Sequence, residues 1–249
     1  MASRRVQAWQ ETIQLSENYP VPAPSTKHTF DSATAWPRKY DTTVIRVVPD
    51  DTITCTKSLQ EANFNPVALN FSDDEEAGGV VELGSAAQEE SLFRQSNYFK
   101  TLLQEFYPLC PGECVYSPRV TVFRGAESHG WPLLASPFEV ALVACPALKY
   151  PCLTDEERFT AEDAELLQVQ LETVLQTACR YGHDAVVLGA WGCGVWGGAP
   201  AHSAEIFKCV LKKYEGAFRE VRFAIIPPPK SNEYVRHENV YDTFCDILG

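Results

Sequence analysis

The segment VALNFSDDEEAGGVVELGSAAQEESL, residues 67–92, combines the features that decide the fold and indicate a site. It begins as an apolar run typical of a buried strand, continues through a glycine-bearing loop, and ends in Gln88-Glu89-Glu90 at the start of an apolar-periodic helix. Glycines in such a turn allow positive φ and let the main chain approach a ligand closely. The segment therefore predicts a site with two carboxylates beside an accessible main chain, although acidic residues at a helix start are also common structural features.

Short β-rich runs alternate with amphipathic helices along the rest of the chain. The predicted strands cover 42–48, 66–71, 119–124, 138–145, 184–190 and 221–226, and the predicted helices cover 88–106, 160–182 and 200–214. A short helix at 4–15 and the proline-rich YPVPAPS predict an amino-terminal arm over 1–40, with one domain over 41–249. Strands that alternate with helices predict an α/β fold with a mixed, largely parallel sheet covered on both faces.

Composition narrows the class of protein. The chain of 249 residues is 45% hydrophobic, contains no run of 18 apolar residues, and begins without the apolar stretch of a secretory signal. We therefore expect a protein that binds no membrane and is intracellular, in the cytoplasm, the nucleus or both. Nine scattered cysteines favour free thiols over a disulfide framework, and no second ligand pair accompanies Cys110 and Cys114, so no metal is expected.

The formal net charge of −12 argues against extended contact with a nucleic-acid backbone, because such contact needs clustered Lys and Arg. We expect no sequence-specific binding of DNA or RNA. A phosphate-bearing ligand would have to be held locally, by main-chain N–H groups or by a few cations.

A second glycine loop, GAWGCGVWGGAP at 189–200, lies between a predicted strand and a predicted helix. A strand, a glycine loop and a helix start together can form a nest of N–H groups for an anion, and an exposed aromatic ring there can stack on a sugar or a base. The alternative is a tight turn in which Trp191 is buried in the core and Trp196 fills a gap. Two glycine loops and a carboxylate pair suggest a ligand resembling a nucleoside diphosphate.

The chain resembles a poly(ADP-ribose) glycohydrolase of the short, bacterial or microbial type, a family with a macrodomain fold. The resemblance rests on Asn70-Phe71, Gly78-Gly79-Val80 and Gln88-Glu89-Glu90, on SLFRQSNYFKTL at 91–102, and on the stretches at 116–124, 182–198 and 218–227. It extends over about 42–227, and the arm is similar to the family's helical extension. It implies a macrodomain-like three-layer α/β/α sandwich with a mixed, largely parallel sheet and an N-terminal helical extension.

The resemblance also implies an activity, namely hydrolysis of ribose–ribose O-glycosidic bonds in poly(ADP-ribose), with release of ADP-ribose. By motif position Glu90 would be the catalytic acid and base, and Glu89 would orient the ribose. The candidate substrate-binding residues are Asn70, Asp73, Gly78, Gly79, Val80, Gln88, Gly192, Cys193, Gly194, Val195 and Trp196. No cofactor is implied, and the expected partners are poly(ADP-ribose) and ADP-ribosylated proteins.

Two alternatives stay open. Val80 replaces the third glycine of the family's triplet, and Asp73, Asp74, Glu75 and Glu76 bring negative charge to the same loop. These departures suggest a noncatalytic module that binds ADP-ribose or the terminal unit of the polymer. The third possibility is an enzyme that removes single ADP-ribose units from proteins.

Overall fold

The computed structural model describes residues 1–34, 36–227 and 239–249 of the chain. Its internal contacts define two compact units. Unit 1 comprises Met1–His28 and Asn70–Pro146, and unit 2 comprises Thr29–Leu69 and Ala147–Gly249. The predicted boundary between an arm over 1–40 and a domain over 41–249 stays a prediction.

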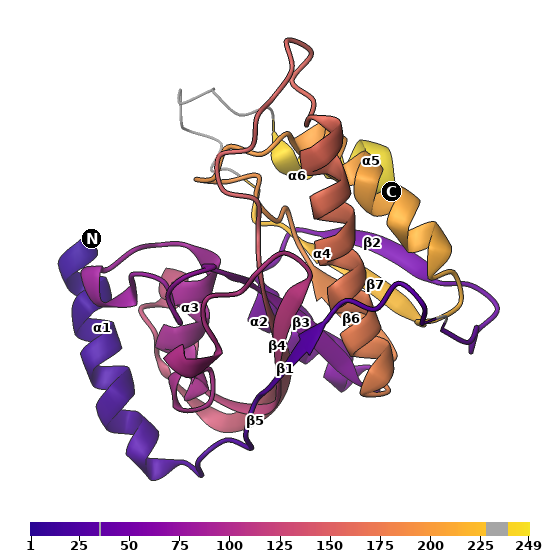
Figure 1. The fold of residues 1–249 in the computed structure, drawn as a ribbon. Coiled ribbons are helices and arrows are strands. Elements are labelled where there is room, and N and C mark those ends of the chain that lie inside the picture. Colours follow the sequence, from indigo (N-terminus) through magenta and orange to yellow (C-terminus); the bar gives the residue numbers. More distant parts are fainter. Residues whose placement is uncertain (35, 228–238) are drawn as a thin grey trace. The chain divides into compact units, whose positions relative to one another are not determined.

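Unit 1 contains the amino-terminal helix and an antiparallel pair of strands (Figure 1). In that pair Val115 lies opposite Ala144. Its regular elements are α1 (Ala2–Leu15), β1 (Thr26–Thr29), α3 (Gln88–Gln95), β4 (Glu113–Arg124) and β5 (Leu133–Pro146), with the 3₁₀ helices η1 (Ser16–Asn18), η2 (Val81–Leu83), η3 (Tyr98–Lys100), η4 (Gln104–Phe106) and η5 (Glu127–His129).

Unit 2 contains the parallel strands, in which β3 pairs with β6, β6 with β7, and β7 with β2. Its elements are β2 (Val44–Val48), α2 (Thr52–Glu61), β3 (Pro66–Ser72), α4 (Ala161–Arg180), β6 (Ala185–Leu188), α5 (Pro200–Lys213), β7 (Glu220–Ala224) and α6 (Val240–Leu248). The last residues of β3 belong to unit 1, and the full strand order is β1-β4-β5-β3-β6-β7-β2. The predicted mixed, largely parallel sheet is confirmed, with seven strands instead of six.

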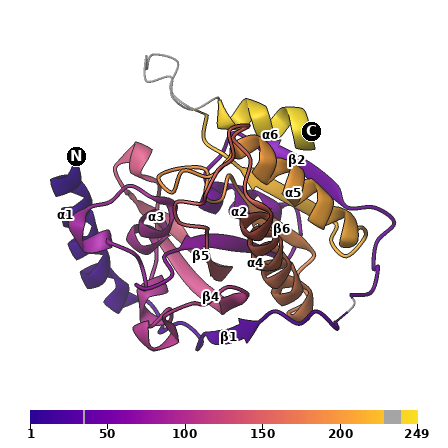
Figure 2. The same cartoon turned by 45° about the horizontal axis from the view of Figure 1, so that its top comes forward.

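Helices cover both faces of the strands of unit 2, and two neighbouring residues of β7 demonstrate it. Phe223 packs against Phe207 of α5 and Phe244 of α6, with ring centroids 5.9 and 5.7 Å away. Arg222 points to the other face, because side chains alternate along a strand, and its Nη1 donates to Ser58 Oγ of α2 at 2.8 Å. In Figure 2, α4, α5 and α6 lie side by side. The layered α/β/α arrangement predicted from the sequence is therefore confirmed.

The helix predicted over 88–106 is wrong in its length. Helix α3 ends at Gln95, because Ser96 is extended (φ −147°, ψ 176°) and forms an isolated β-bridge with Val122. Asn97 continues this pairing, since its N–H donates to Thr121 O at 3.1 Å and its Oδ1 accepts from Thr121 N–H at 2.8 Å. Tertiary pairing with β4 thus outweighs the apolar spacing beyond Gln95. The prediction also omitted β1 and α2.

The amino-terminal helix predicted at 4–15 forms as α1, and a buried arginine joins it to β4. Arg124 donates to Ala8 O at 2.7 Å, to Thr12 Oγ1 at 3.0 Å and to Glu11 Oε2 at 2.9 Å. Thr12 Oγ1 in turn donates to Arg94 O of α3 at 2.7 Å. Because α3 carries the Gln-Glu-Glu triplet, α1 directly supports the element that holds the candidate carboxylates.

Two observations concern the composition of the chain. All nine cysteines are free thiols, as expected. Among the residues that the structure describes, no helix has both the length and the apolar character needed to cross a membrane.

Candidate active site

One group of the predicted site residues lies in unit 1, where the loop after β3 meets the start of α3. Gln88 Oε1 accepts the N–H of Phe71 at 2.9 Å, which ties the first turn of the helix to the end of the strand. Glu89 and Glu90 follow in the same turn and are only 3% and 4% exposed. Two carboxyl groups are therefore buried side by side at a helix amino terminus, where the helix dipole favours negative charge.

Glu89 has a hydrogen-bond donor on each carboxyl oxygen. Its Oε1 accepts from Asn70 Nδ2 at 3.0 Å and from Gly78 N–H at 3.2 Å, and its Oε2 accepts from Asp73 N–H at 2.8 Å. Burial raises the pKa of Glu89 to about 8; the Asp73 and Asn70 donors oppose this shift, and the charge of Glu90 adds to it. The carboxyl group of Glu89 thus fastens the loop to the strand.

Glu90 is held differently. Its Oε1 accepts the N–H of Val80 at 3.2 Å, whereas its Oε2 is buried and has no hydrogen-bond partner among the described residues. Arg94 lies one helical turn further on and is fully buried; it donates to Ser85 O at 2.6 Å, while its Nε and Nη1 have no partner in the described chain. One carboxyl oxygen of Glu90 therefore has a hydrogen-bond donor, and the other is buried without one among the described residues.

The two glycines of the loop are required by geometry. Gly78 has φ +83°, and a Cβ there would lie 2.2 Å from the ring of Phe93. Gly79 has φ +57°, and a Cβ there would lie 2.8 Å from Glu90 Oε1. Val80 has φ −111° and is 49% exposed, so its branched side chain causes no backbone strain and points to solvent. The replacement of the family's third glycine is thus compatible with the loop.

The acidic residues before the glycines organise the turn. Asp73 Oδ1 accepts the N–H groups of Glu75 at 2.8 Å and Glu76 at 3.0 Å. Glu75 and Glu76 are exposed, and Asp74 is half-buried. An aspartate that accepts the N–H groups two and three residues further on is a common turn device, so Asp73 has a structural role here whether or not it also binds ligand.

Another group of the predicted site residues lies in unit 2, in the loop between β6 and α5. Gly192 and Gly197 have φ values of +77° and +71°. Among the described residues, the N–H groups of Gly192, Gly194, Val195 and Trp196 donate to no other group of the chain. The N–H of Cys193 differs from these, because it donates to Ala190 O at 3.1 Å. The loop thus presents main-chain N–H groups suited to an anion, and Cys193 already uses its own.

The two tryptophans of this loop have different environments. Trp191 is 1% exposed and belongs to the core, as the alternative interpretation of the loop predicted. Trp196 is half-buried and lies beside the residues that follow β5: its ring is 5.4 Å from that of Tyr150, and Lys149 Nζ lies 5.0 Å from its centroid. Only Trp196 is therefore placed to contact a ligand.

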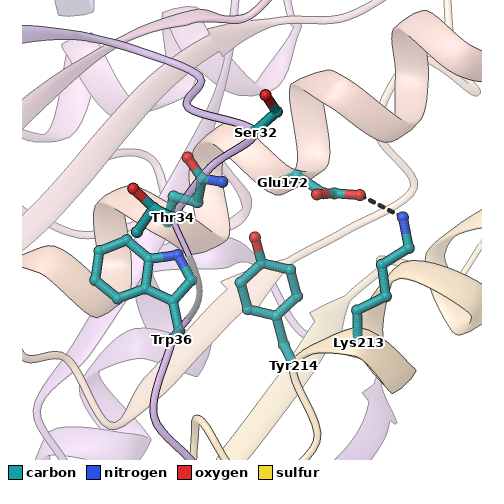
Figure 3. Close-up of a pocket in the computed structure, with 7 residues that line it drawn as sticks. Ser32, Thr34, Trp36, Glu172, Lys213 and Tyr214 are labelled. Carbon is teal, nitrogen blue, oxygen red and sulfur yellow. Dashed lines mark hydrogen bonds and ion pairs between the residues drawn. The ribbon is translucent and has the colours of Figure 1, made fainter.

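A cavity of about 210 Å³ in unit 2 contains none of the predicted site residues (Figure 3). Its polar groups are largely paired with one another or with the main chain. Lys213 Nζ bonds to Glu172 Oε1 at 2.6 Å, and Gln176 bonds to both the N–H and the carbonyl of Asp31. We therefore assign no chemistry to this cavity. Its lining residues are Ser32, Thr34, Trp36, Glu172, Gln176, Lys213 and Tyr214.

Sequence reasoning overlooked three residues near these loops, namely Arg94, Lys149 and Tyr150. Arg94 stands four positions after Glu90 on α3, a spacing that places both on one face of a helix. Lys149 and Tyr150 lie in the loop that follows β5, and ligands often bind in the loops at strand ends of α/β folds. The spacing of Arg94 from Glu90 and the position of Lys149 and Tyr150 after a strand could both be read from the sequence, but neither belongs to a recognised motif.

Comparison with known proteins connects this geometry with a family. The model of the microbial-type PARG catalytic domain matches residues 4–125, which include the first loop and the start of α3. A search of curated proteins finds no match.

Solved structures resemble the chain over almost its full length. Poly(ADP-ribose) glycohydrolase from Thermomonospora curvata is 27% identical, with 99% of each chain covered and a TM-score of 0.80. The same enzyme bound to the inhibitor ADP-HPD gives 27% identity, 99% of each chain and a TM-score of 0.79. Poly(ADP-ribose) glycohydrolase from Deinococcus radiodurans in complex with ADP-ribose is 25% identical, with 95% of this chain and 96% of that chain covered and a TM-score of 0.74. In sequence and in fold, the chain is similar to the microbial-type poly(ADP-ribose) glycohydrolases.

Proposed function

We propose that this protein hydrolyses the ribose–ribose O-glycosidic bonds of poly(ADP-ribose) and releases ADP-ribose, with Glu90 as the general acid and base. The observation that carries the proposal is the environment of Glu90. One of its oxygens is held by the N–H of Val80, and the other has no partner among the described residues. A side chain that transfers a proton needs a fixed position and an oxygen within hydrogen-bond reach of the reacting group.

In the proposed reaction the protonated carboxyl group of Glu90 donates its proton to the departing ribose oxygen. The glycosidic C–O bond breaks and leaves an oxocarbenium-like centre on the other ribose. The Glu90 carboxylate then removes a proton from a water molecule, whose oxygen forms a bond to the anomeric carbon. Glu90 is thereby returned to its protonated form, and each step conserves the proton.

The remaining residues have supporting roles in the proposal. Glu89 orients the ribose from a carboxyl group that three N–H donors already hold in place. In the second loop, the unused N–H groups of Gly192, Gly194 and Val195 bind the diphosphate, and Trp196 lies beside the ribose. We leave Cys193 out of this set, because its N–H already donates to Ala190 O.

The test is the substitution Glu90→Gln in the full chain, assayed for release of ADP-ribose from the polymer. Glutamine keeps an oxygen for the Val80 N–H but cannot transfer the proton, so we expect turnover to fall by a factor of about 10² to 10⁴ while the protein stays folded. Glu82→Gln is the matched control, because Glu82 is an exposed glutamate of η2 in the same unit. Equal turnover by the two variants would contradict the assignment of Glu90.

Ligand binding separates the proposed enzyme from its alternatives. A noncatalytic module would bind ADP-ribose in calorimetry and leave the polymer intact even at high protein concentration. An enzyme for single units would release ADP-ribose from mono-ADP-ribosylated proteins and not from the polymer. Failure to bind ADP-ribose at millimolar concentration would contradict all three.

The expected partners and location follow from the same proposal. The ligands are poly(ADP-ribose) and ADP-ribosylated proteins, and the net charge of −12 disfavours sequence-specific binding of DNA or RNA. We place the protein in the cytoplasm, the nucleus or both. Fractionation of cells that express it would test the location.

A further inference from the structure

Three side chains form a cluster beside the second glycine loop of unit 2. Lys149 Nζ lies 5.0 Å from the ring centroid of Trp196, and the ring of Tyr150 meets that of Trp196 at 81° with centroids 5.4 Å apart. The Tyr150 N–H also donates to Trp196 O at 3.1 Å. The Lys149 ammonium group and the Tyr150 ring thus lie against Trp196, whose own N–H donates to no other group among the described residues.

The backbone of Tyr150 is strained without an evident benefit to packing. Its φ is +51°, in the left-handed region that a bulky aromatic residue rarely adopts. Its side chain is nevertheless 70% exposed, so burial of the ring does not offset the strain. A strained residue kept at the surface suggests a role in function, because such conformations persist where a site requires them.

The charges around the cluster indicate which kind of ligand it would bind. The chain carries a net charge of −12, and a diphosphate approaching it is opposed by that field. The N–H groups of Gly194, Val195 and Trp196 supply partial positive charge, and the cationic ammonium group of Lys149 lies over the Trp196 ring. Both point to the same ligand group, an anion bound next to Trp196.

We propose that Lys149 binds a phosphate of the ADP-ribose unit and that Tyr150 is a positioning residue that holds Lys149 and Trp196 for this contact. The proposal rests on the proposed function, since it takes ADP-ribose as the ligand of the second loop. To the proposed function it adds a charged contact from Lys149, which sets the affinity for phosphate.

The experiment is calorimetry of ADP-ribose binding to the full chain with Lys149→Met, Lys149→Arg and Lys212→Met. Lys212 is an exposed lysine near the end of α5 in the same unit, so its variant matches the loss of charge. We expect Lys149→Met to weaken binding roughly fivefold to tenfold at low salt and Lys149→Arg to restore most of the affinity. The difference from Lys212→Met should shrink at about 1 M salt, where the screening length is about 3 Å.

The possible outcomes separate the two proposals. If the wild-type protein does not bind ADP-ribose, the proposed function fails at the second loop. If the wild-type protein binds and Lys149→Met equals Lys212→Met in affinity, the role of Lys149 is overturned and the proposed function stands. A loss in Lys149→Met that is independent of salt and is not restored by Lys149→Arg would also overturn it, since it would reflect packing on Trp196.

A second variant tests Tyr150. Tyr150→Gly removes the ring and relieves the positive φ, so we expect unchanged or higher thermal stability together with weaker binding of ADP-ribose. Asn63→Gly is the control, because Asn63 lies in the same unit and also has a positive φ, of +60°. Binding by Tyr150→Gly equal to that of Asn63→Gly would refute the positioning role.

Discussion

Gly79→Ala is the most direct test of the first loop, because one added methyl group reaches the candidate catalytic carboxyl. Gly79 has φ +57°, and an added Cβ would lie 2.8 Å from Glu90 Oε1 and 3.4 Å from Glu89 Oε2. The first distance is shorter than a van der Waals contact, so Glu90 must move. The end of a glutamate side chain can do so at little cost in stability, but the carboxyl group then leaves its place beside the Val80 N–H.

The two consequences have different magnitudes. An alanine forced into the left-handed region costs about 1–2 kcal/mol of folding free energy, which for a chain of this size corresponds to a fall in Tm of about 2–8 °C. A displacement of a catalytic group by about 1 Å can cost on the order of 10²-fold in rate. We therefore expect a modest loss of stability and a large loss of kcat/KM.

The assay is ADP-ribose release from the polymer together with thermal unfolding, and Gly182→Ala is the control. Gly182 has φ +73°, and an added Cβ there meets nothing within 4 Å, so the control carries the same backbone cost without the contact. We expect both variants to lose similar stability and only Gly79→Ala to lose activity. Full activity in Gly79→Ala would refute the placement of Glu90, and an equal loss of activity in both would show that backbone strain alone is responsible.

Three further predictions follow from individual contacts. The pKa of Glu89 is raised from 4.5 to about 8, so between these two pH values the folded state holds a proton that the unfolded state has lost. The free energy of unfolding of the wild type, relative to that of Glu89→Gln, should therefore fall by about 1.4 kcal/mol per pH unit across this range and level off above it. Denaturant unfolding at a series of pH values measures this difference. Arg124→Met should lower the free energy of unfolding by on the order of 3 kcal/mol, since it removes the buried hydrogen bonds from Arg124 to Ala8 O, Thr12 Oγ1 and Trp131 O; a loss below about 1 kcal/mol in urea unfolding would contradict the proposed anchoring of α1. In Gly198→Ala the new Cβ would lie 2.8 Å from Gly192 O, so the loop must shift, and calorimetry should show weaker ADP-ribose binding with polymer turnover reduced in proportion.

Much of the fold was predictable because it depends on local pattern. The spacing of apolar residues predicted α1, α4 and α5, and Thr160 caps α4 by accepting the N–H of Asp163. The exception is 88–106, where the apolar spacing continues but the helix stops at Gln95. Pairing of Ser96 with Val122 ends it, and a contact between residues so distant in sequence leaves no trace in local periodicity.

The residue types of the candidate site were likewise visible in the sequence, and their relative roles were not. Gln88-Glu89-Glu90 after a glycine loop indicates carboxylates beside an accessible main chain. Which of the two glutamates keeps an available oxygen depends on where N–H donors lie, and those donors come from Asn70, Asp73 and the loop.

The sequence by itself thus determined most of the strands and helices, the glycines that allow the two loops, and the carboxyl groups beside one of them, because each depends on residues close together in the chain. Tertiary structure alone decided that Glu89 is saturated with donors while Glu90 is not, that Val80 needs no positive φ, and that Lys149 and Tyr150 lie against Trp196. These properties arise from hydrogen bonds and ring contacts between segments that only folding brings together, and the N–H donors that distinguish the two glutamates reach them only once the loop is packed.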